Sequence, residues 1–145
     1  MFLNEIRNVL RHGKKRVALR EAYHITTTTL LPSIMSTGLR VGSGNKNYQY
    51  TSPAIFLTDN ITEDTLERIG SIVLTGGRTE QEMETSPPID DLIIIRVNLA
   101  GWDHPIYIDD VMKLAGCFYT EHPIPATRLQ VLGRVDFVSL KIVPL

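Results

Sequence analysis

The chain has 145 residues, of which 43% are hydrophobic, so it has the size of one domain and enough apolar side chains for an ordinary core. Its 15 Lys and Arg against 16 Asp and Glu give a formal net charge of -1, which excludes a protein-wide positive field for nucleic acid or an anionic membrane. The single cysteine, Cys117, excludes an intramolecular disulfide, and no Cys/His cluster has zinc-ligand spacing. We therefore expect a single metal-free domain over residues 1–145.

The expected location follows from the lack of a long apolar run. The longest apolar cluster, Leu92 to Ile95, is far too short to span a bilayer, and the first residues show no small-residue cleavage site. We therefore expect a cytoplasmic protein with no membrane partner.

In chain order, the first half of the sequence alternates helix and strand patterns. Apolar residues at helical spacing predict a helix over residues 2–10, and a basic cluster follows at residues 11–20. For that cluster a solvated turn is the favoured interpretation, and a phosphate or nucleic-acid contact is the alternative. Strands are expected over residues 18–26 and 54–58, separated by a helix and by a polar loop at residues 41–53.

The two helices of this half have candidate end signals. Threonines 26–29 are candidate N-caps of the first helix, Pro32 is tolerated in its first turn, and Gly38 suits its C-terminal end. Asn60 and Glu63 resemble a capping box that opens the second helix. The expected inward stripes are Leu30, Leu31, Ile34 and Met35 in the first helix and Leu66, Ile69 and Val73 in the second.

The second half of the sequence predicts most of a sheet. After an exposed connector at residues 78–91, residues 91–99 predict a central strand covered on both sides. Arg96 on that strand is expected to reach the sheet end or to pair with an acidic residue. Further strands are expected at residues 106–108, 116–121, 129–137 and 138–145, with a brief helix at 110–114 and a bulge at Gly133. The element order predicts an α+β fold with a split or mixed β-sheet and flanking helices.

His24 is the polar residue around which the functional hypothesis is built. Alternation along the strand places it on a face with small neighbours, which leaves room for a ligand beside the ring. A core histidine more often has large apolar neighbours. On position alone, a packing role and a ligand-binding role are equally well supported.

Most common catalytic motifs are missing from the sequence. It has no G-x-S-x-G elbow, no Walker A loop and no H-E-x-x-H, and Cys117 is typical of a packed small hydrophobe. The remaining candidates are His24 at a strand end, hydroxyls at a helix start, and the isolated carboxylate of Glu121 beside a proline-rich turn. A histidine suits a sugar hydroxyl, and a carboxylate suits an oxocarbenium-like charge.

Five stretches, in order, resemble the ADP-ribosyltransferase-like superfamily, which includes NAD-dependent DNA and protein ADP-ribosyltransferases, poly-ADP-ribose polymerases and RNA 2′-phosphotransferases. They are Tyr23-His24-Ile25-Thr26, Ile34 to Leu39, Ala54 to Thr58, Leu92 to Leu99, and Tyr119 to Pro125. The resemblance implies an ADP-ribosyltransferase-like split β-sheet whose cleft binds NAD at the first strand.

The resemblance also implies the roles of particular residues. His24 and Glu121 would be catalytic, and the cofactor-binding residues would be Tyr23, His24, Thr26, Tyr50 and Phe56. Phe56 stands where many members carry a tyrosine that stacks on nicotinamide. Gly116 and Cys117 stand where transferases carry a catalytic glutamate, and the nearest carboxylate is that of Glu121.

The function implied is transfer of ADP-ribose from NAD to a macromolecular acceptor, protein or nucleic acid, as toxins and phage-type modifiers do. The alternative on the same fold is a non-catalytic protein that binds a nucleotide or a partner, as an inhibitor or a sequestering factor would. A minor option is RNA 2′-phosphotransfer, for which Arg20, Arg40 and Arg96 are candidate residues.

Overall fold

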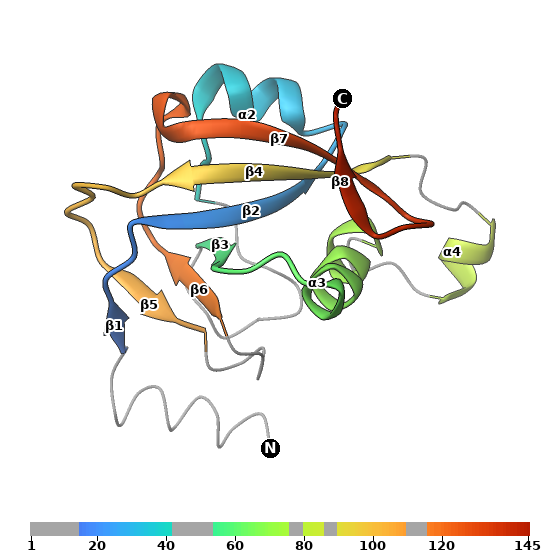
Figure 1. The fold of residues 1–145 in the computed structure, drawn as a ribbon, viewed down its shortest axis with the longest axis horizontal. Coiled ribbons are helices and arrows are strands. Elements are labelled where there is room, and N and C mark those ends of the chain that lie inside the picture. The colour runs from blue at the N-terminus through green and yellow to red at the C-terminus, as the bar shows by residue number, and fades with distance from the viewer. Residues whose placement is uncertain (1–14, 42–53, 76–79, 86–89, 110–115) are drawn as a thin grey trace.

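The computed structural model describes residues 15–41, 54–75, 80–85, 90–109 and 116–145. Its strands form one eight-stranded sheet in the order β1-β5-β6-β3-β2-β4-β7-β8, and every pairing is antiparallel (Figure 1). The strands are β1 (Arg16–Val17), β2 (Glu21–Thr27), β3 (Ile55–Thr58), β4 (Leu92–Asn98), β5 (Ile106–Ile108), β6 (Cys117–Thr120), β7 (Leu129–Asp136) and β8 (Lys141–Val143). The α+β prediction is confirmed, whereas a mixed sheet is wrong because these strands pair only antiparallel.

Helices cover both faces of this sheet. They are α2 (Leu31–Thr37), α3 (Glu63–Thr75), α4 (Glu80–Thr85) and a 3₁₀ turn, η1 (Ala126–Arg128). One core cluster lies on the α2 side and includes Leu31 and Ile34, and the other contains Leu66 of α3 (Figure 1). The α2 stripe was predicted too wide, because Leu30 and Met35 are exposed. The connector predicted over residues 78–91 contains α4.

Strand β4 is the centre of the core. It lies between β2 and β7, and its residues alternate between the two core clusters, with Ile93 and Ile95 in one and Ile94 in the other. All three are fully buried, which confirms the predicted central strand. Its one exposed cation, Arg96, lies 2.8 Å (Nε) from Glu21 Oε1 on β2, so the predicted pairing with an acid is also confirmed.

The predicted bulge is present in β7. The β4–β7 register shifts between Ile94, opposite Gly133, and Ile95, opposite Val131. Gly133 has φ +151° and approaches β8 so closely that a Cβ there would lie 2.1 Å from the Val143 carbonyl oxygen. Glycine is therefore required at this point of the sheet.

The threonine N-caps predicted for α2 are not formed. Thr26 and Thr27 belong to β2, whose last residue pairs with Leu92 of β4, and the N-cap is Leu30 with no side-chain hydrogen bond. The hydroxyls of Thr28 and Thr29 bind the segment before β4 instead, at the Asp91 carbonyl and the Asp90 carboxylate. Strand pairing overrides capping here because the β2–β4 ladder continues through Thr27.

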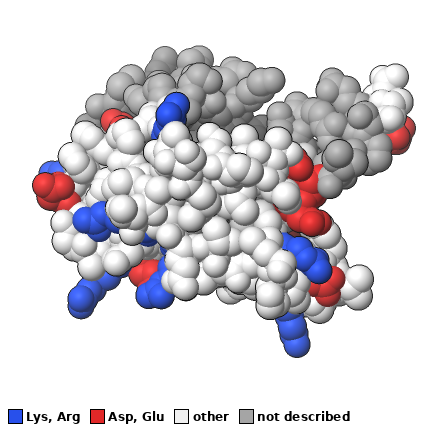
Figure 2. Space-filling view, turned by 90° about the horizontal axis from the view of Figure 1, so that it is seen from above, with Lys and Arg blue, Asp and Glu red and all other residues white. Residues whose placement is uncertain are grey.

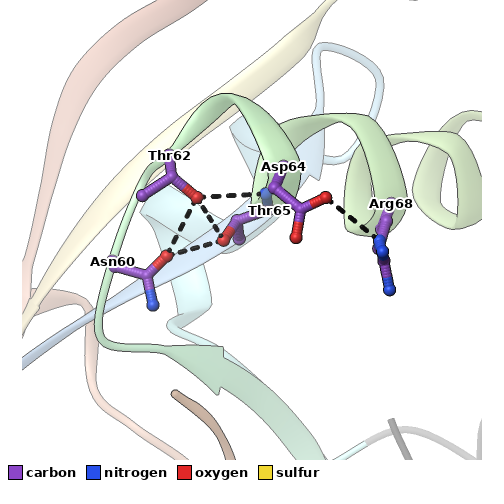
Figure 3. A network of polar contacts seen from close by, with 5 residues as sticks. All are labelled: Asn60, Thr62, Asp64, Thr65 and Arg68. Atoms are coloured by element: carbon purple, nitrogen blue, oxygen red, sulfur yellow. Dashed lines mark hydrogen bonds and ion pairs between the residues drawn. The ribbon is translucent and has the colours of Figure 1, made fainter. Parts of the chain in front are cut away.

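The predicted capping box at the start of α3 is also wrong (Figure 3). Thr62 is the N-cap, because its hydroxyl oxygen accepts the Thr65 N–H at 3.2 Å. The Asn60 side chain supports this cap and accepts the Thr65 hydroxyl proton at 2.6 Å. Beyond the cap, Asp64 and Arg68 form an exposed pair one turn apart. The predicted inward stripe of Leu66, Ile69 and Val73 does pack in the second core cluster.

Other predicted elements fall outside the described residues. These are the helix at residues 2–10, the loop after residue 41, the glycines at 76–77 and the helix at 110–114.

Two glycines allow a matched test of how α2 ends. Gly38 has φ +85°, and a Cβ there would lie 2.3 Å from the Ile124 carbonyl oxygen, whereas Gly101 has φ +70° with nothing within 4 Å. Gly101→Ala should therefore cost only the left-handed backbone strain, about 1–2 kcal/mol in the free energy of unfolding. Gly38→Ala should cost clearly more, because the bridge between Leu39 and Ile124 must also open. Urea unfolding of both variants measures the difference, and equal losses would contradict this role of Gly38.

Candidate functional site

The sheet splits between β2 and β3. All seven residues of β2 pair with β4, but β2 pairs with β3 only through Tyr23 and Thr58. Beyond that pair the two strands separate, and β3 stays paired along its length with β6. We call this place, beside the strand that contains His24, the split.

The imidazole of His24 spans this split. Its Nδ1 lies 2.9 Å from the backbone carbonyl oxygen of Phe56 on β3. Because a carbonyl oxygen can only accept, Nδ1 must carry the proton. In the neutral ring Nε2 is then an acceptor, and Nε2 makes no hydrogen bond with the described residues.

The environment favours this neutral ring. Burial lowers the pKa of His24 below its ordinary value of 6.5, and the hydrogen bond to the Phe56 carbonyl only partly opposes that shift. At neutral pH the side chain is therefore a fixed hydrogen-bond acceptor for a ligand hydroxyl.

Two cavities meet at His24. The first, about 240 Å³, lies on the α3 side and is lined by Tyr23, His24, Ile25, Thr26, Leu30, Phe56, Leu57, Thr58, Ile69, Ile72, Val73, Asp109 and Cys117. The second, about 280 Å³, lies on the α2 side and is lined by His24, Thr26, Leu30, Ser33, Ile34, Thr37, Gly38, Leu39, Arg40, Ala54, Ile55 and Phe56. His24, Thr26, Leu30 and Phe56 line both cavities, so we call the two together the cleft.

Both ends of the cleft have mostly apolar linings, and they differ in their charged residues, Asp109 on the α3 side and Arg40 on the α2 side. The α3 side is mostly apolar and includes the Phe56 ring, which suits a flat, weakly polar group. On the α2 side the cleft is lined by Arg40, an exposed cation, and by Ser33 and Thr37. The surface on the α2 side is largely uncharged, with charged side chains mainly around its rim (Figure 2). Among the described residues that line the second cavity, Arg40 is the one charged side chain.

The structure brings together most of the residues predicted for the site. His24, Thr26 and Phe56 line both cavities, and Tyr23 lines the first while donating its hydroxyl proton to Glu21 at 3.1 Å. Tyr50 lies outside the described residues.

Glu121, predicted to be catalytic, is not brought to the cleft. It follows the last residue of β6, is half-buried and lines neither cavity. The carboxylate that does line the cleft is that of Asp109, which is only 5% exposed. The sequence pattern predicted only a brief helix at residues 110–114 after this position and gave Asp109 no place in the site. The position of Asp109 is set by strand pairing, because its backbone N–H donates to the Cys117 carbonyl oxygen at 2.9 Å, next to the paired strands β5 and β6.

Cys117 also lines the cleft, and its environment favours the protonated thiol. Burial first, and then the negative charges of Asp109 and Asp59, raise the pKa of its thiol to about 11. The thiol is therefore protonated at neutral pH, which agrees with the predicted packing role.

The lowered pKa of His24 predicts a pH-dependent stability. The unfolded chain binds the proton near pH 6.5 whereas the folded protein does not, so stability falls as the pH drops below 6.5 towards the folded pKa. The limiting slope for this one group is about 1.4 kcal/mol per pH unit. His24→Gln keeps a side-chain N–H for the Phe56 carbonyl but cannot titrate. Urea unfolding between about pH 7 and about pH 5 should show a smaller loss for His24→Gln than for the wild type. Parallel curves would contradict a buried neutral His24.

Three further findings bear on the kind of protein this is. Within the described residues no cluster of His, Cys, Asp and Glu could hold a metal ion. None of the described helices is long and apolar enough to cross a membrane. No protein-family model and no curated protein matches the sequence.

Proposed function

We propose that the cleft binds NAD and that the protein is an ADP-ribosyltransferase-like enzyme, which transfers ADP-ribose to a macromolecular acceptor. The observation that carries the proposal is the bond from His24 Nδ1 to the Phe56 carbonyl across the split. This bond leaves Nε2 as an acceptor between the two cavities, where it suits a ribose hydroxyl. The Phe56 side chain in the first cavity suits a flat ring, and Arg40 in the second cavity suits phosphates.

The position of Arg40 suggests how NAD would lie in the cleft. The nicotinamide ring fits the apolar α3 side against Phe56, and a hydroxyl of its ribose donates to His24 Nε2. The diphosphate then points to the α2 side, where Arg40 lies. Thr26, which lines both cavities, is beside the ribose position.

The chemistry breaks the bond between the ribose C1′ and the nicotinamide nitrogen. Nicotinamide leaves neutral with the electron pair of that bond, positive charge develops on the ribose, and an acceptor nucleophile bonds to C1′ and loses its proton. A nearby carboxylate stabilises the developing charge. We assign that role to Asp109, which lines the α3 side of the cleft, because Glu121, the residue implied by the resemblance, lines neither cavity.

The first test is incubation of the protein with NAD labelled in the adenosine part, alone and with cell lysate. We expect released nicotinamide or label attached to a macromolecule. His24→Ala should lose most of this activity, because it removes both the ribose acceptor and the bond that spans the split. The outcome that would sink the proposal is no transfer and no NAD hydrolysis by the wild-type protein.

A second test separates the two carboxylates. Asp109→Asn and Glu121→Gln are nearly isosteric and remove one charge each, and far-UV circular dichroism checks that each variant folds. If Asp109 stabilises the cation, Asp109→Asn should lower kcat by about 100-fold or more while Glu121→Gln changes it little. The reverse result would return the catalytic role to Glu121.

A second candidate function is a non-catalytic nucleotide-binding protein on the same fold, such as a sequestering factor. The observation that favours it is the start of β6, where Gly116 and Cys117 supply no carboxylate and the Cys117 thiol is protonated. It predicts a rise in melting temperature with NAD and no release of nicotinamide. Turnover in the same samples would exclude it.

A further inference from the structure

A separate cavity is lined by the β1–β2 and β4–β5 connections. Both connections lie at the left of the view in Figure 1. The cavity has a volume of about 310 Å³, and it is lined by residues 16–20 and by residues between 99 and 106, Trp102 and His104 among them. We call it the Trp102 cavity. Because it shares no lining residue with the cleft, a function for this cavity does not depend on the proposed NAD chemistry.

The Trp102 cavity is positively charged. Arg16 and Arg20 line it and are exposed, and none of the described residues that line it is acidic. Neither guanidinium forms a salt bridge within the described part of the chain, unlike Arg96, whose Nε lies 2.8 Å from Glu21. The Asp103 carboxylate lies beside this cavity, 3.7 Å from His104 Nε2, but two exposed arginines that are not engaged in a salt bridge still attract anions, phosphate above all.

A row of planar side chains borders the same cavity. The Arg128 guanidinium lies 5.1 Å from the centre of the Trp102 ring, Trp102 meets His104 edge-on at 5.0 Å, and His104 stacks on His122 at 4.0 Å. Arg128 is fixed because it donates to the carbonyls of Asn98 and Ala100. At the other end the exposed ring of His122 lets a flat group extend the row.

Trp102 has an unsatisfied donor. Its indole Nε1 is the one buried side-chain nitrogen or oxygen in the described residues that lacks a hydrogen-bond partner. A buried N–H group without an acceptor lowers the stability of the fold, because the hydrogen bond that it makes to water in the unfolded chain is lost.

We propose that the Trp102 cavity binds single-stranded nucleic acid, with phosphates on Arg16 and Arg20 and a base stacked on His122. Positive charge next to a stacking platform is the combination that holds unpaired strands. A duplex fits less well, because its bases already stack on one another and do not offer their faces to a side chain. The net charge of -1 is compatible with this, because the attraction is local.

The test uses the full-length protein and a short oligonucleotide of mixed sequence, as single-stranded DNA and RNA and as the matching duplex. Fluorescence anisotropy of a labelled strand measures binding, and the emission of Trp102, the only tryptophan, reports whether the strand lies at this cavity. We expect single strands to bind and to change the Trp102 emission. With two phosphate contacts the affinity should fall about sevenfold between about 50 and about 200 mM salt.

Single substitutions separate the charge from the stacking. Arg16→Gln and Arg20→Gln should each reduce the slope of log affinity against log salt by about 0.7. His122→Ala should weaken binding about fivefold or more without changing that slope. Arg68→Gln is the matched control, because Arg68 is an exposed arginine on α3 outside the cavity, and it should leave both quantities unchanged.

Several results would overturn the proposal. They are no binding at low salt, binding that leaves the Trp102 emission unchanged, and binding that survives the double variant Arg16→Gln/Arg20→Gln. Equal binding of the duplex, or binding of inorganic phosphate as tight as that of the oligonucleotide, would overturn the assignment to single strands.

Discussion

The hydrogen bond from His24 to the Phe56 carbonyl is the interaction on which both the sheet and the cleft depend. Beyond Tyr23 and Thr58, strands β2 and β3 are no longer paired, and the imidazole supplies the donor that a strand would otherwise provide. The same bond fixes which ring nitrogen carries the proton. One side chain therefore joins the two halves of the sheet and presents an acceptor to the space between them.

The rest of the fold keeps that side chain in place. Strand β2 is fully paired on its other edge with β4, whose isoleucines are buried from both faces. Each buried isoleucine stabilises the fold by about 1.5–3 kcal/mol, so β4 provides a rigid support for β2. Because β2 is paired along one edge and mostly unpaired along the other, it can line a cleft and still hold its side chains in fixed positions. A fixed position is what the His24 acceptor needs in order to select one hydroxyl of a ligand.

The two candidate sites lie at different places on the sheet and differ in the side chains that would hold a ligand. The cleft is mostly buried and apolar, and its polar groups are few, with His24 and Asp109 as the main ones on the α3 side. The Trp102 cavity is polar and cationic, and its planar groups come from connections rather than strands. A buried acceptor suits recognition of a small ligand, whereas exposed arginines suit a polyanion.

Features that depend on local sterics and on periodic burial could be predicted from the amino-acid sequence. They include the central position of β4, the bulge at Gly133 and the helix end at Gly38. The site was predicted in part: His24 and its neighbours line the cleft, but Asp109 was missed and Glu121 lies outside. Tertiary contacts alone set the position of the split in the sheet, the threonines that bind the segment before β4, and the carboxylate of the cleft. These depend on pairing between segments far apart in the chain, which local pattern does not encode.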